Sequence, residues 1–469
     1  MKKLSVAVFA AFVIFWCVWF FGYRHYLIWL EGYSFFASLP DVMSQFLSVK
    51  EGLPGYVGAF LHQFYSMPAA GAAIQALLTV IPMFCLGVVV LRLFKNPERF
   101  LWIAMLPIPF VVYRQFWDLN LYKTLIIDFA SIILMAAAAL VSLMTKVKIG
   151  LPKMSGHWSV SVLAVVAVMS LSLYYLILED FGKKAHEEYA RLEYLGENHR
   201  WEEILKTVSP KDAASDELKR AYALLALSES GLLTEWAFRY GLDGQNNFVF
   251  TDRIDPLYLN YNALFYQCNE MHNAVIQQSY QQGIQSVTGV SFSTVRRLAD
   301  TYLALKDYDL AKKYIDILSH SSCHGKWVKK RLPELEAIKS ADPAYEYDAD
   351  KSNIADFVHT MSSMVDMNRE NRKYADLLLC ALLSDEEGEK FMSLIRNVAG
   401  YQYPSGAGLP RLYEEALVLI AMTDPQVLDG FTVSEDTYNR FYDYVGMMNA
   451  GRGTQALRKH AETYWAYSY

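Results

Sequence analysis

The stretch WSVSVLAVVAVMSLSLYYLIL, residues 158–178, divides the chain into two halves of different character. It has no charged residue, and as a helix it is long enough to cross the roughly 30 Å hydrocarbon core of a bilayer. Apolar runs dominate before it, whereas the residues after it have the composition of a soluble protein. We therefore predict a transmembrane domain over 1–178 and a soluble region over 179–469.

The two halves also differ in charge. Residues 1–178 contain 12 Lys and Arg against 6 Asp and Glu, and residues 179–469 contain 31 against 43. Proteins that bind nucleic acid need a basic surface, so the acidic soluble region argues against a nucleic-acid partner. The 5 cysteines are scattered along the chain and give no disulfide framework.

Four further apolar runs precede the dividing stretch: Leu4–Tyr23, Ala69–Leu91, Phe100–Tyr113 and Thr124–Thr145. The third run is short and contains two prolines, so its length alone would make it re-entrant or interfacial. If all five runs cross and the N-terminus is cytoplasmic, most Lys and Arg residues of this half lie on the cytoplasmic side of the membrane. This agrees with the positive-inside rule. We predict about five spans in the inner (cytoplasmic) membrane, with the soluble region in the periplasm.

One acidic residue, Asp128, lies within the fourth run. Ionisable residues inside a membrane are functional candidates, because burying their charge in hydrocarbon is unfavourable. A simpler interpretation is that Asp128 reaches the membrane interface or pairs with Arg114, and we favour it.

The first external loop, residues 24–68, is longer than a tight connection requires, and long loops are often functional. Two amphipathic helices in the plane of the membrane surface are expected in it, at Leu39–Val49 and Tyr56–Tyr65. The chain between them is expected to be broken at its glycines and proline: Gly52, Pro54, Gly55 and Gly58.

Two acids of this loop are candidates for catalysis. Polytopic glycosyltransferases place a catalytic acid in a first external loop near the membrane, and Glu31 and Asp41 are placed similarly. The alternative is that Asp41 begins a helix and that Glu31 pairs with Arg24 or His25. We favour this second interpretation.

The soluble region has helical periodicity almost throughout, and three segments resemble helix–turn–helix repeats of the tetratricopeptide type. In the clearest, RRLADTYLALKDYDLAKKYIDIL (296–318), the packing positions hold Ala299, Tyr302, Ala311, Ile315 and Leu318. Weaker copies are LLALSESGLLTEWAFRYGL (224–242) and LEYLGENHRWEEILKTV (192–208). The predicted fold is all-α: a transmembrane helix bundle, tetratricopeptide-like α-solenoid repeats over 179–338, and a further helical region over 339–469.

Stacked helical repeats form a concave surface that commonly binds peptide or protein. Four aromatic residues are the candidate contacts for such a partner: Trp236, Tyr258, Tyr261 and Tyr302. The alternative is a superhelix that only braces the membrane half.

Recognisable catalytic and metal-binding motifs are missing from the sequence. It contains no phosphate-binding Gly-rich loop, no His-Glu-x-x-His and no Gly-x-Ser-x-Gly. His320-x-x-Cys323-His324 has the residue types of a metal site but no second cluster, so a polar helix end is the favoured interpretation. We predict neither a metal nor a cofactor.

The loop segment GLPGYVGAFLHQFY (Gly52–Tyr65), followed by an apolar span, resembles the first loop of a bacteroidete multi-pass membrane family, domain of unknown function 6057. Further shared features are Tyr194 with Trp201 and Ile204, FTDRIDPL (Phe250–Leu257) and Thr463-Tyr464-Trp465. The resemblance implies a multi-span N-terminal region and a C-terminal helical repeat domain, and it implies nothing catalytic.

These observations support two hypotheses. The first is an integral membrane protein of the cell envelope that contacts lipid and whose extracytoplasmic helical region binds another protein or an envelope polymer. The second is a membrane-embedded enzyme acting on lipid-linked glycan, with Glu31 or Asp41 as its acid. Such enzymes usually build their lipid-substrate cavity from more than five spans, so the non-enzymatic hypothesis is favoured.

Overall fold

The computed structural model describes residues 1–117, 120–145, 148–149, 183–341, 357–403 and 408–469. Over these residues the chain is helical, and an isolated bridge between Phe94 and Ile149 is their one β-type pairing. The prediction of an all-α fold is confirmed. The predicted fifth span, Trp158–Leu178, lies outside the described residues.

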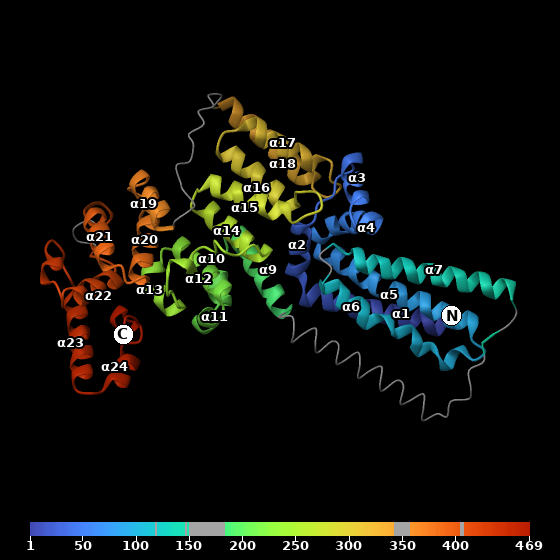
Figure 1. Cartoon of the computed structure of the whole chain (residues 1–469), viewed down its shortest axis with the longest axis horizontal. Helices are drawn as coiled ribbons and strands as arrows, with labels where there is room; N and C mark the ends of the chain where they lie inside the picture. The colour runs from blue at the N-terminus through green and yellow to red at the C-terminus, as the bar shows by residue number, and fades with distance from the viewer. Residues whose placement is uncertain (118–119, 146–147, 150–182, 342–356, 404–407) are drawn as a thin grey trace. The chain divides into compact units, whose positions relative to one another are not determined.

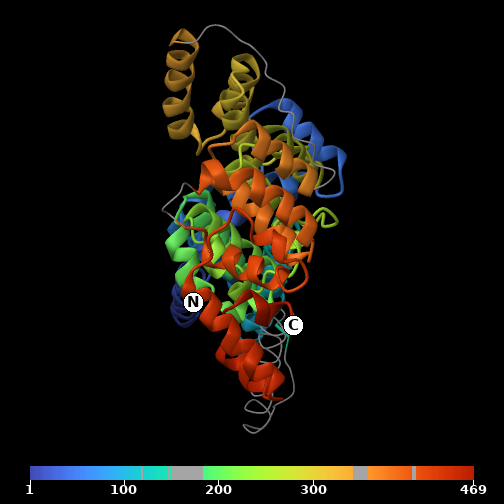
Figure 2. The same ribbon diagram turned by 90° about the vertical axis from the view of Figure 1, so that its left-hand side faces the viewer.

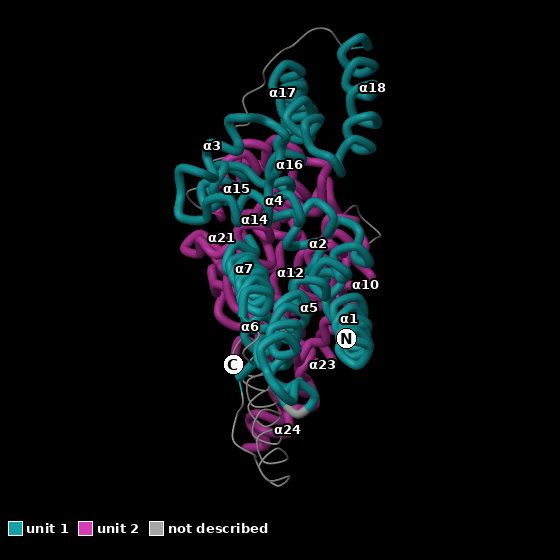
Figure 3. The backbone as a smooth tube through the Cα atoms, turned by 90° about the vertical axis from the view of Figure 1, so that its right-hand side faces the viewer, with its two compact units in different colours: residues 1–191, 279–347 teal, residues 192–278, 348–469 magenta. Residues whose placement is uncertain are grey.

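The chain forms two compact units (Figure 3). Unit 1 comprises residues 1–191 and 279–347, and unit 2 comprises residues 192–278 and 348–469. Each unit is assembled from two stretches that are distant in sequence. Part of the region expected to be soluble therefore packs with the apolar half.

Three long apolar helices form the bundle of unit 1: α1 (Lys2–Gly22), α5 (Pro68–Leu93) and α7 (Tyr122–Met144). Each is long and apolar enough to cross a membrane, and α5 packs against both of the others (Figure 1). Gly87 allows α1 to come close, because a Cβ there would lie 2.5 Å from the Leu4 side chain. The short run Leu101–Phe116 is divided by Pro107 into η3 (Leu101–Met105) and α6 (Pro107–Trp117).

Residues 24–68 fold into a compact group of helices, here called the cap: α2 (Arg24–Tyr33), α3 (Pro40–Ser48), α4 (Gly52–His62) and η1 (Gln63–Ser66). The helix predicted at Leu39–Val49 is confirmed as α3. The predicted break was wrong, because its glycines and proline form α4 itself. Pro54 lies in the first turn, where no N–H donor is needed, and Gly58 packs so closely that a Cβ would overlap the Asn120 carbonyl oxygen.

The cap contacts α16 (Phe292–Ala304) and the connection 320–324 between α17 (Tyr308–Ser319) and α18 (Gly325–Ala341), all far along the chain (Figures 1 and 2). The Phe292 N–H donates to the Ser34 carbonyl oxygen at 2.8 Å. The Ser38 N–H donates to the His320 carbonyl oxygen at 3.1 Å. These backbone bonds make the cap the surface on which α16–α18 are docked.

Helices α16 and α17 form the hairpin that the pattern of 296–318 predicts. Ala299, Ala311, Ile315 and Leu318 are buried at the packing positions. Tyr302 is half-buried and stacks on the Tyr314 ring, with 5.7 Å between centroids. The assignment of this hairpin to the tetratricopeptide type, and of the region to a solenoid, remains a prediction.

Unit 2 consists of short helices: α10 (Trp201–Thr207), α11 (Pro210–Ser215), α12 (Glu217–Glu229), α13 (Leu233–Trp236), η4 (Phe238–Tyr240), η5 (Gln245–Asn247), α14 (Pro256–Cys268), α19 (Phe357–Met367), α20 (Arg372–Ser384), α21 (Gly388–Gln402), α22 (Arg411–Ile420), η6 (Pro425–Leu428), α23 (Glu435–Asn449), α24 (Gly453–Lys459) and α25 (Tyr464–Tyr467). Helices α9 (Lys183–Glu197) and α15 (His272–Ile284) each contribute to both units. In the segment 224–242, α13 is a single turn, so the second helix of that predicted repeat is truncated.

Candidate functional site

A cavity of about 710 Å³ opens in unit 2 between α13, the start of α20, the start of α22 and the C-terminal segment. Its wall includes Trp236, which is one of the predicted contact residues and is 36% exposed. Three arginines from distant parts of the chain also line it: Arg239, Arg372 and Arg411. Glu235, Glu415 and Glu462 line it too, so the cavity combines aromatic surface with paired acidic and basic groups.

Each of these arginines is held by one carboxylate. The guanidinium-to-carboxylate distances are 3.1 Å for Arg239–Glu462, 3.1 Å for Arg372–Asp376 and 2.8 Å for Arg411–Glu415. A guanidinium carries five N–H donors, so one carboxylate leaves others available to a ligand. The carboxylates thus orient the arginines without saturating them.

Aromatic rings support two of the three arginines. Arg239 lies over the Trp236 ring at 4.8 Å, and Arg372 lies over the Tyr403 ring at 4.8 Å. Such stacking fixes the plane of a guanidinium and so reduces the conformational entropy lost when it binds a ligand. Tyr403 is itself held by a hydrogen bond of 2.5 Å from its hydroxyl to Asp376.

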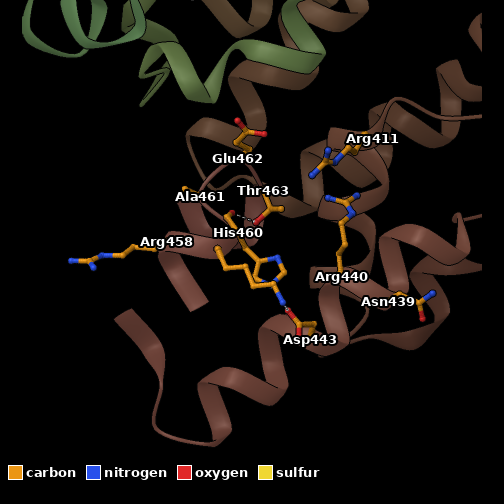
Figure 4. Close-up of a pocket in the computed structure, with 10 residues that line it drawn as sticks. Arg411, Asn439, Arg440, Asp443, Arg458, His460, Ala461, Glu462 and Thr463 are labelled. Atoms are coloured by element: carbon orange, nitrogen blue, oxygen red, sulfur yellow. Dashed lines mark hydrogen bonds and ion pairs between the residues drawn. The ribbon is translucent and has the colours of Figure 1, made fainter. Parts of the chain in front are cut away.

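A second cavity of about 550 Å³ adjoins the first, and Arg411 and Glu462 line both (Figure 4). Figure 4 shows the guanidinium groups of Arg411 and Arg440 close together on one wall. Both bind the same buried carboxylate, Glu415, whose other oxygen accepts the Tyr464 N–H at 2.8 Å. Arg440 also pairs with Asp436 at 2.9 Å, so this wall presents two guanidinium groups held in place by two carboxylates.

A polar triad also lines the second cavity. The His460 ring lies 2.7 Å from the Asp443 carboxylate, and the Lys459 amine lies 2.8 Å from it. Hydrogen bonds from Lys459 and His460 hold the pKa of Asp443 below its ordinary value. Arginine forks of this kind bind carboxylate or phosphate groups in bidentate fashion, so the two cavities suit an anionic ligand group.

The other predicted contact residues lie away from these cavities. Tyr261 is fully buried and donates to the Ala221 carbonyl oxygen at 3.0 Å, so it is a core residue. Tyr258 donates to Glu217 at 2.6 Å. Tyr302, in unit 1, approaches the Tyr280 hydroxyl at 3.5 Å. Of the four, Trp236 alone lines a cavity described here.

Glu31, the first catalytic candidate, is 1% exposed at the centre of a buried ion-pair cluster in unit 1. Its carboxylate lies 2.7 Å from His324 Nε2 and 3.3 Å from Arg296 Nη2. Burial raises the pKa of Glu31, but the charges and hydrogen bonds of Arg296 and His324 outweigh burial and hold it below its ordinary value. The expected partners were wrong: His25 binds Glu187 at 2.6 Å instead.

Two other polar residues of the cap, His62 and Asp41, differ in burial. His62, next to the cluster, is fully buried, and within the described part of the chain neither ring nitrogen has a hydrogen-bond partner. Asp41, the second catalytic candidate, is exposed in the first turn of α3, as the alternative interpretation predicts. The structure therefore does not bring Glu31 and Asp41 together in one buried site.

His324 of the sequence His320-x-x-Cys323-His324 belongs to the Glu31 cluster and stacks on Phe292, with 4.2 Å between ring centroids. Within the described ranges, no three His, Cys, Asp or Glu residues are grouped as metal ligands. In the bundle, Asp128 is buried, whereas Arg114 lies over the Tyr113 ring at 5.6 Å. Asp128 and Arg114 form no ion pair among the described residues.

Comparison with known proteins identifies the family. A family model described as a family of unknown function, DUF6057, matches residues 1–178 and 125–469. The chain belongs to this family. Neither the curated proteins nor the solved structures contain a match to the chain. Family membership confirms the resemblance seen in the sequence, whereas a bacteroidete origin and a tetratricopeptide-like domain remain predictions.

Replacing Glu31 by Gln is expected to lower the free energy of unfolding by about 3 kcal/mol, because it leaves His324 and Arg296 without their shared anion. The matched control is Glu98→Gln, which removes an exposed ion pair with Lys3 and should change stability by less than about 1 kcal/mol. Denaturant unfolding of the detergent-solubilised protein measures both. Equal effects of the two substitutions would show that the cluster is not a stabilising contact.

His62 is expected to make the protein sensitive to acid. Burial lowers its pKa to about 3, whereas unfolded His titrates near ~6.5. Between pH ~6.5 and about 3, His62 is protonated in the unfolded state but not in the folded state. The stability that this residue contributes is therefore fully present above pH ~6.5. Below it, the free energy of unfolding falls by up to about 1.4 kcal/mol per unit of pH. His62→Phe should flatten this dependence, measured as unfolding midpoint against pH, while the exposed control His199→Asn should not.

Proposed function

We propose that the protein is a five-span membrane protein of the cell envelope whose helical region binds a protein or polymer partner on the outer side. The first support is the position of the helix ends in unit 1. Lys3 at the start of α1 lies 2.9 Å from Glu98, which follows α5. The Lys95 N–H donates to the Ile149 carbonyl oxygen at 3.1 Å. The start of α1 and the ends of α5 and α7 therefore share one end of the bundle.

The cap marks the other end of the bundle. Trp16 Nε1 near the end of α1 donates to the Ala69 carbonyl oxygen at 3.1 Å, and the Tyr26 hydroxyl donates to the Phe116 carbonyl oxygen at 3.4 Å. The start of α7 packs on Gly58 of the cap. Since α5 ends at the first end and α7 starts at the second, the chain between them returns along the bundle. This supports crossing by the short run Leu101–Phe116.

The same reasoning supports a fifth crossing. Ile149 lies at the first end of the bundle, whereas the Glu187 carboxylate accepts the Tyr26 N–H at 2.8 Å at the second end. These two described residues therefore lie at opposite ends of the bundle, which supports one further crossing between them. The cations Lys2, Lys3, Arg92 and Lys95 at the first end support, by the positive-inside rule, an outer position for the cap and α16–α18.

The binding role rests on the cavity in unit 2. Its arginines are oriented by carboxylates and aromatic rings, and Trp236 stands exposed at its wall. Interfaces draw much of their binding energy from such tryptophan and arginine residues. The partner's chemistry is an anionic group presented by a protein or polymer of the envelope. The alternative of an enzyme acting on lipid-linked glycan stays a prediction, and the ion pairs of Glu31 favour a structural part for that residue.

Reporter-enzyme fusions after residue 145 and at Tyr469 test the topology. The proposal predicts cytoplasmic activity for the first and periplasmic activity for the second, because one further crossing lies between them. Activity of both fusions on the same side would contradict five spans.

Photo-crosslinking tests the binding role in cells that express the full chain. A benzoylphenylalanine at Trp236 is expected to crosslink one defined species, whereas the same probe at Tyr442, exposed in the same unit, should not. Arg411→Ala should weaken that crosslink about tenfold, since it removes charge-assisted hydrogen bonds worth about 1.5–3 kcal/mol. Arg440 still pairs with Glu415 in this variant, so the fold is retained. Equal crosslinking at both positions, or no effect of Arg411→Ala, would overturn the proposal.

A further inference from the structure

The bundle of unit 1 contains a carboxyl group that the binding role does not use. Asp128 of α7 is 2% exposed, and among the described residues neither carboxylate oxygen has a hydrogen-bond partner. Buried polar groups are otherwise nearly always paired in folded proteins, and an intramembrane acid is retained against a large solvation penalty. An unpaired acid in this position therefore needs a physical explanation.

No nearby cation provides that explanation. Arg114 of α6 lies over the ring of Tyr113 and makes no ion pair with Asp128 in the described part of the chain. On α5, Cys85 is within electrostatic reach of Asp128, but a thiol brings no positive charge. Neither His62 of α4 nor Lys123 at the start of α7 exerts a resolved charge effect on Asp128. An ionised Asp128 would be an isolated anion among apolar helices, which is strongly unfavourable.

The bundle contains a second group of buried polar side chains, on α5 and α6. Gln75 of α5 is fully buried, and its amide group has no partner among the described residues. The side-chain Nε2 of Gln115 donates to the backbone carbonyl oxygen of Gln75 at 2.8 Å. The Thr79 hydroxyl donates to the side-chain Oε1 of Gln115 at 3.2 Å. Unpaired buried amides are positions at which proteins commonly hold ordered water. The interior of the bundle is therefore polar on its cap side.

Asp128 also lies nearer to the cap end than to the other end. It is six residues from the start of α7 and sixteen from its end, which correspond to about 9 Å and about 24 Å of helix rise. Measured along α7, the shorter distance to water is therefore the one toward the cap end.

We propose that Asp128 is a proton-binding site within the bundle, reached by protons from the cap end. A proton from water on that side adds to one carboxylate oxygen and gives a neutral carboxylic acid, and its release restores the carboxylate. One proton satisfies a single carboxylate, whereas a metal ion in this position would need several oxygen ligands. The proposal assigns the membrane half a chemical role beyond anchoring, independent of the cavity in unit 2.

The test is labelling with dicyclohexylcarbodiimide, an apolar reagent that modifies protonated carboxyl groups. The full-length protein is reconstituted in liposomes, labelled, and mapped by mass spectrometry of its peptides. Asp41, exposed on α3, is the matched control, because its carboxyl group lies in water. Labelling at Asp128 is expected to exceed labelling at Asp41 about 100-fold and to fall when the pH on the cap side alone is raised.

An infrared spectrum provides a second readout that does not depend on reagent access. The carbonyl band of a protonated carboxylic acid should be present in the unmodified protein and absent in Asp128→Asn, a substitution that preserves shape. Gln75→Leu should slow the response of labelling to cap-side pH by about tenfold. Absence of both the label and the band, or a response only to pH on the opposite side, would overturn the proposal.

Discussion

The buried ion pairs of Glu31 with Arg296 and His324 are the interaction on which the arrangement of unit 1 depends. A carboxylate that is 1% exposed is stable only with its counter-charges in place. These counter-charges come from α16 and from the residue before α18, more than 260 positions later in the chain. The cluster can therefore form only when the cap and α16–α18 are docked on each other.

Docking of the cap on α16–α18 has consequences for the rest of the chain. The cap follows α1 and precedes α5, so it fixes on which end of the apolar bundle the later helices lie. Further contacts reinforce the junction: Gln63 Oε1 accepts the Ser322 N–H at 2.9 Å, and the Ser293 hydroxyl donates to the Gly32 carbonyl oxygen at 2.9 Å. Helices α16–α18 are thus built onto the apolar half of the chain.

The sequence predicts those parts of the fold that local patterns determine. The 3.6-residue periodicity of 296–318 identifies α16 and α17, and Pro40 with Asp41 marks the start of α3. The prediction from sequence failed at Gly52–Gly58, where residues that usually interrupt helices form α4. Pro54 fits in the first turn of this helix, and Gly58 packs closely on Asn120. The glycines and the proline of this segment predict a turn, but packing against the rest of unit 1 stabilises a helix instead.

Sites that are assembled from distant segments escaped prediction. The sequence singled out Glu31 but paired it with its neighbours Arg24 and His25, because spacing along one helix says nothing about helices far away. The arginines of the unit 2 cavity, Arg239, Arg372 and Arg411, each look like ordinary surface residues in sequence. Trp236, one of the four aromatic residues selected from the sequence, lines the same cavity, and its contact with a partner stays a prediction.

The docking of the cap on α16 is tested most directly by a disulfide between Gly32→Cys and Ser293→Cys. A Cβ at residue 32 would lie 3.5 Å from the Ser293 Cβ, within the spacing that a disulfide requires. The full-length protein in membranes is predicted to form this bond on mild oxidation, mapped by peptide mass spectrometry with the native cysteines kept. The control pair Gly22→Cys and Ser293→Cys should not crosslink, since a Cβ at residue 22 has no neighbour within 4 Å. Absence of the 32–293 bond, or equal crosslinking of the control pair, would contradict the docked arrangement.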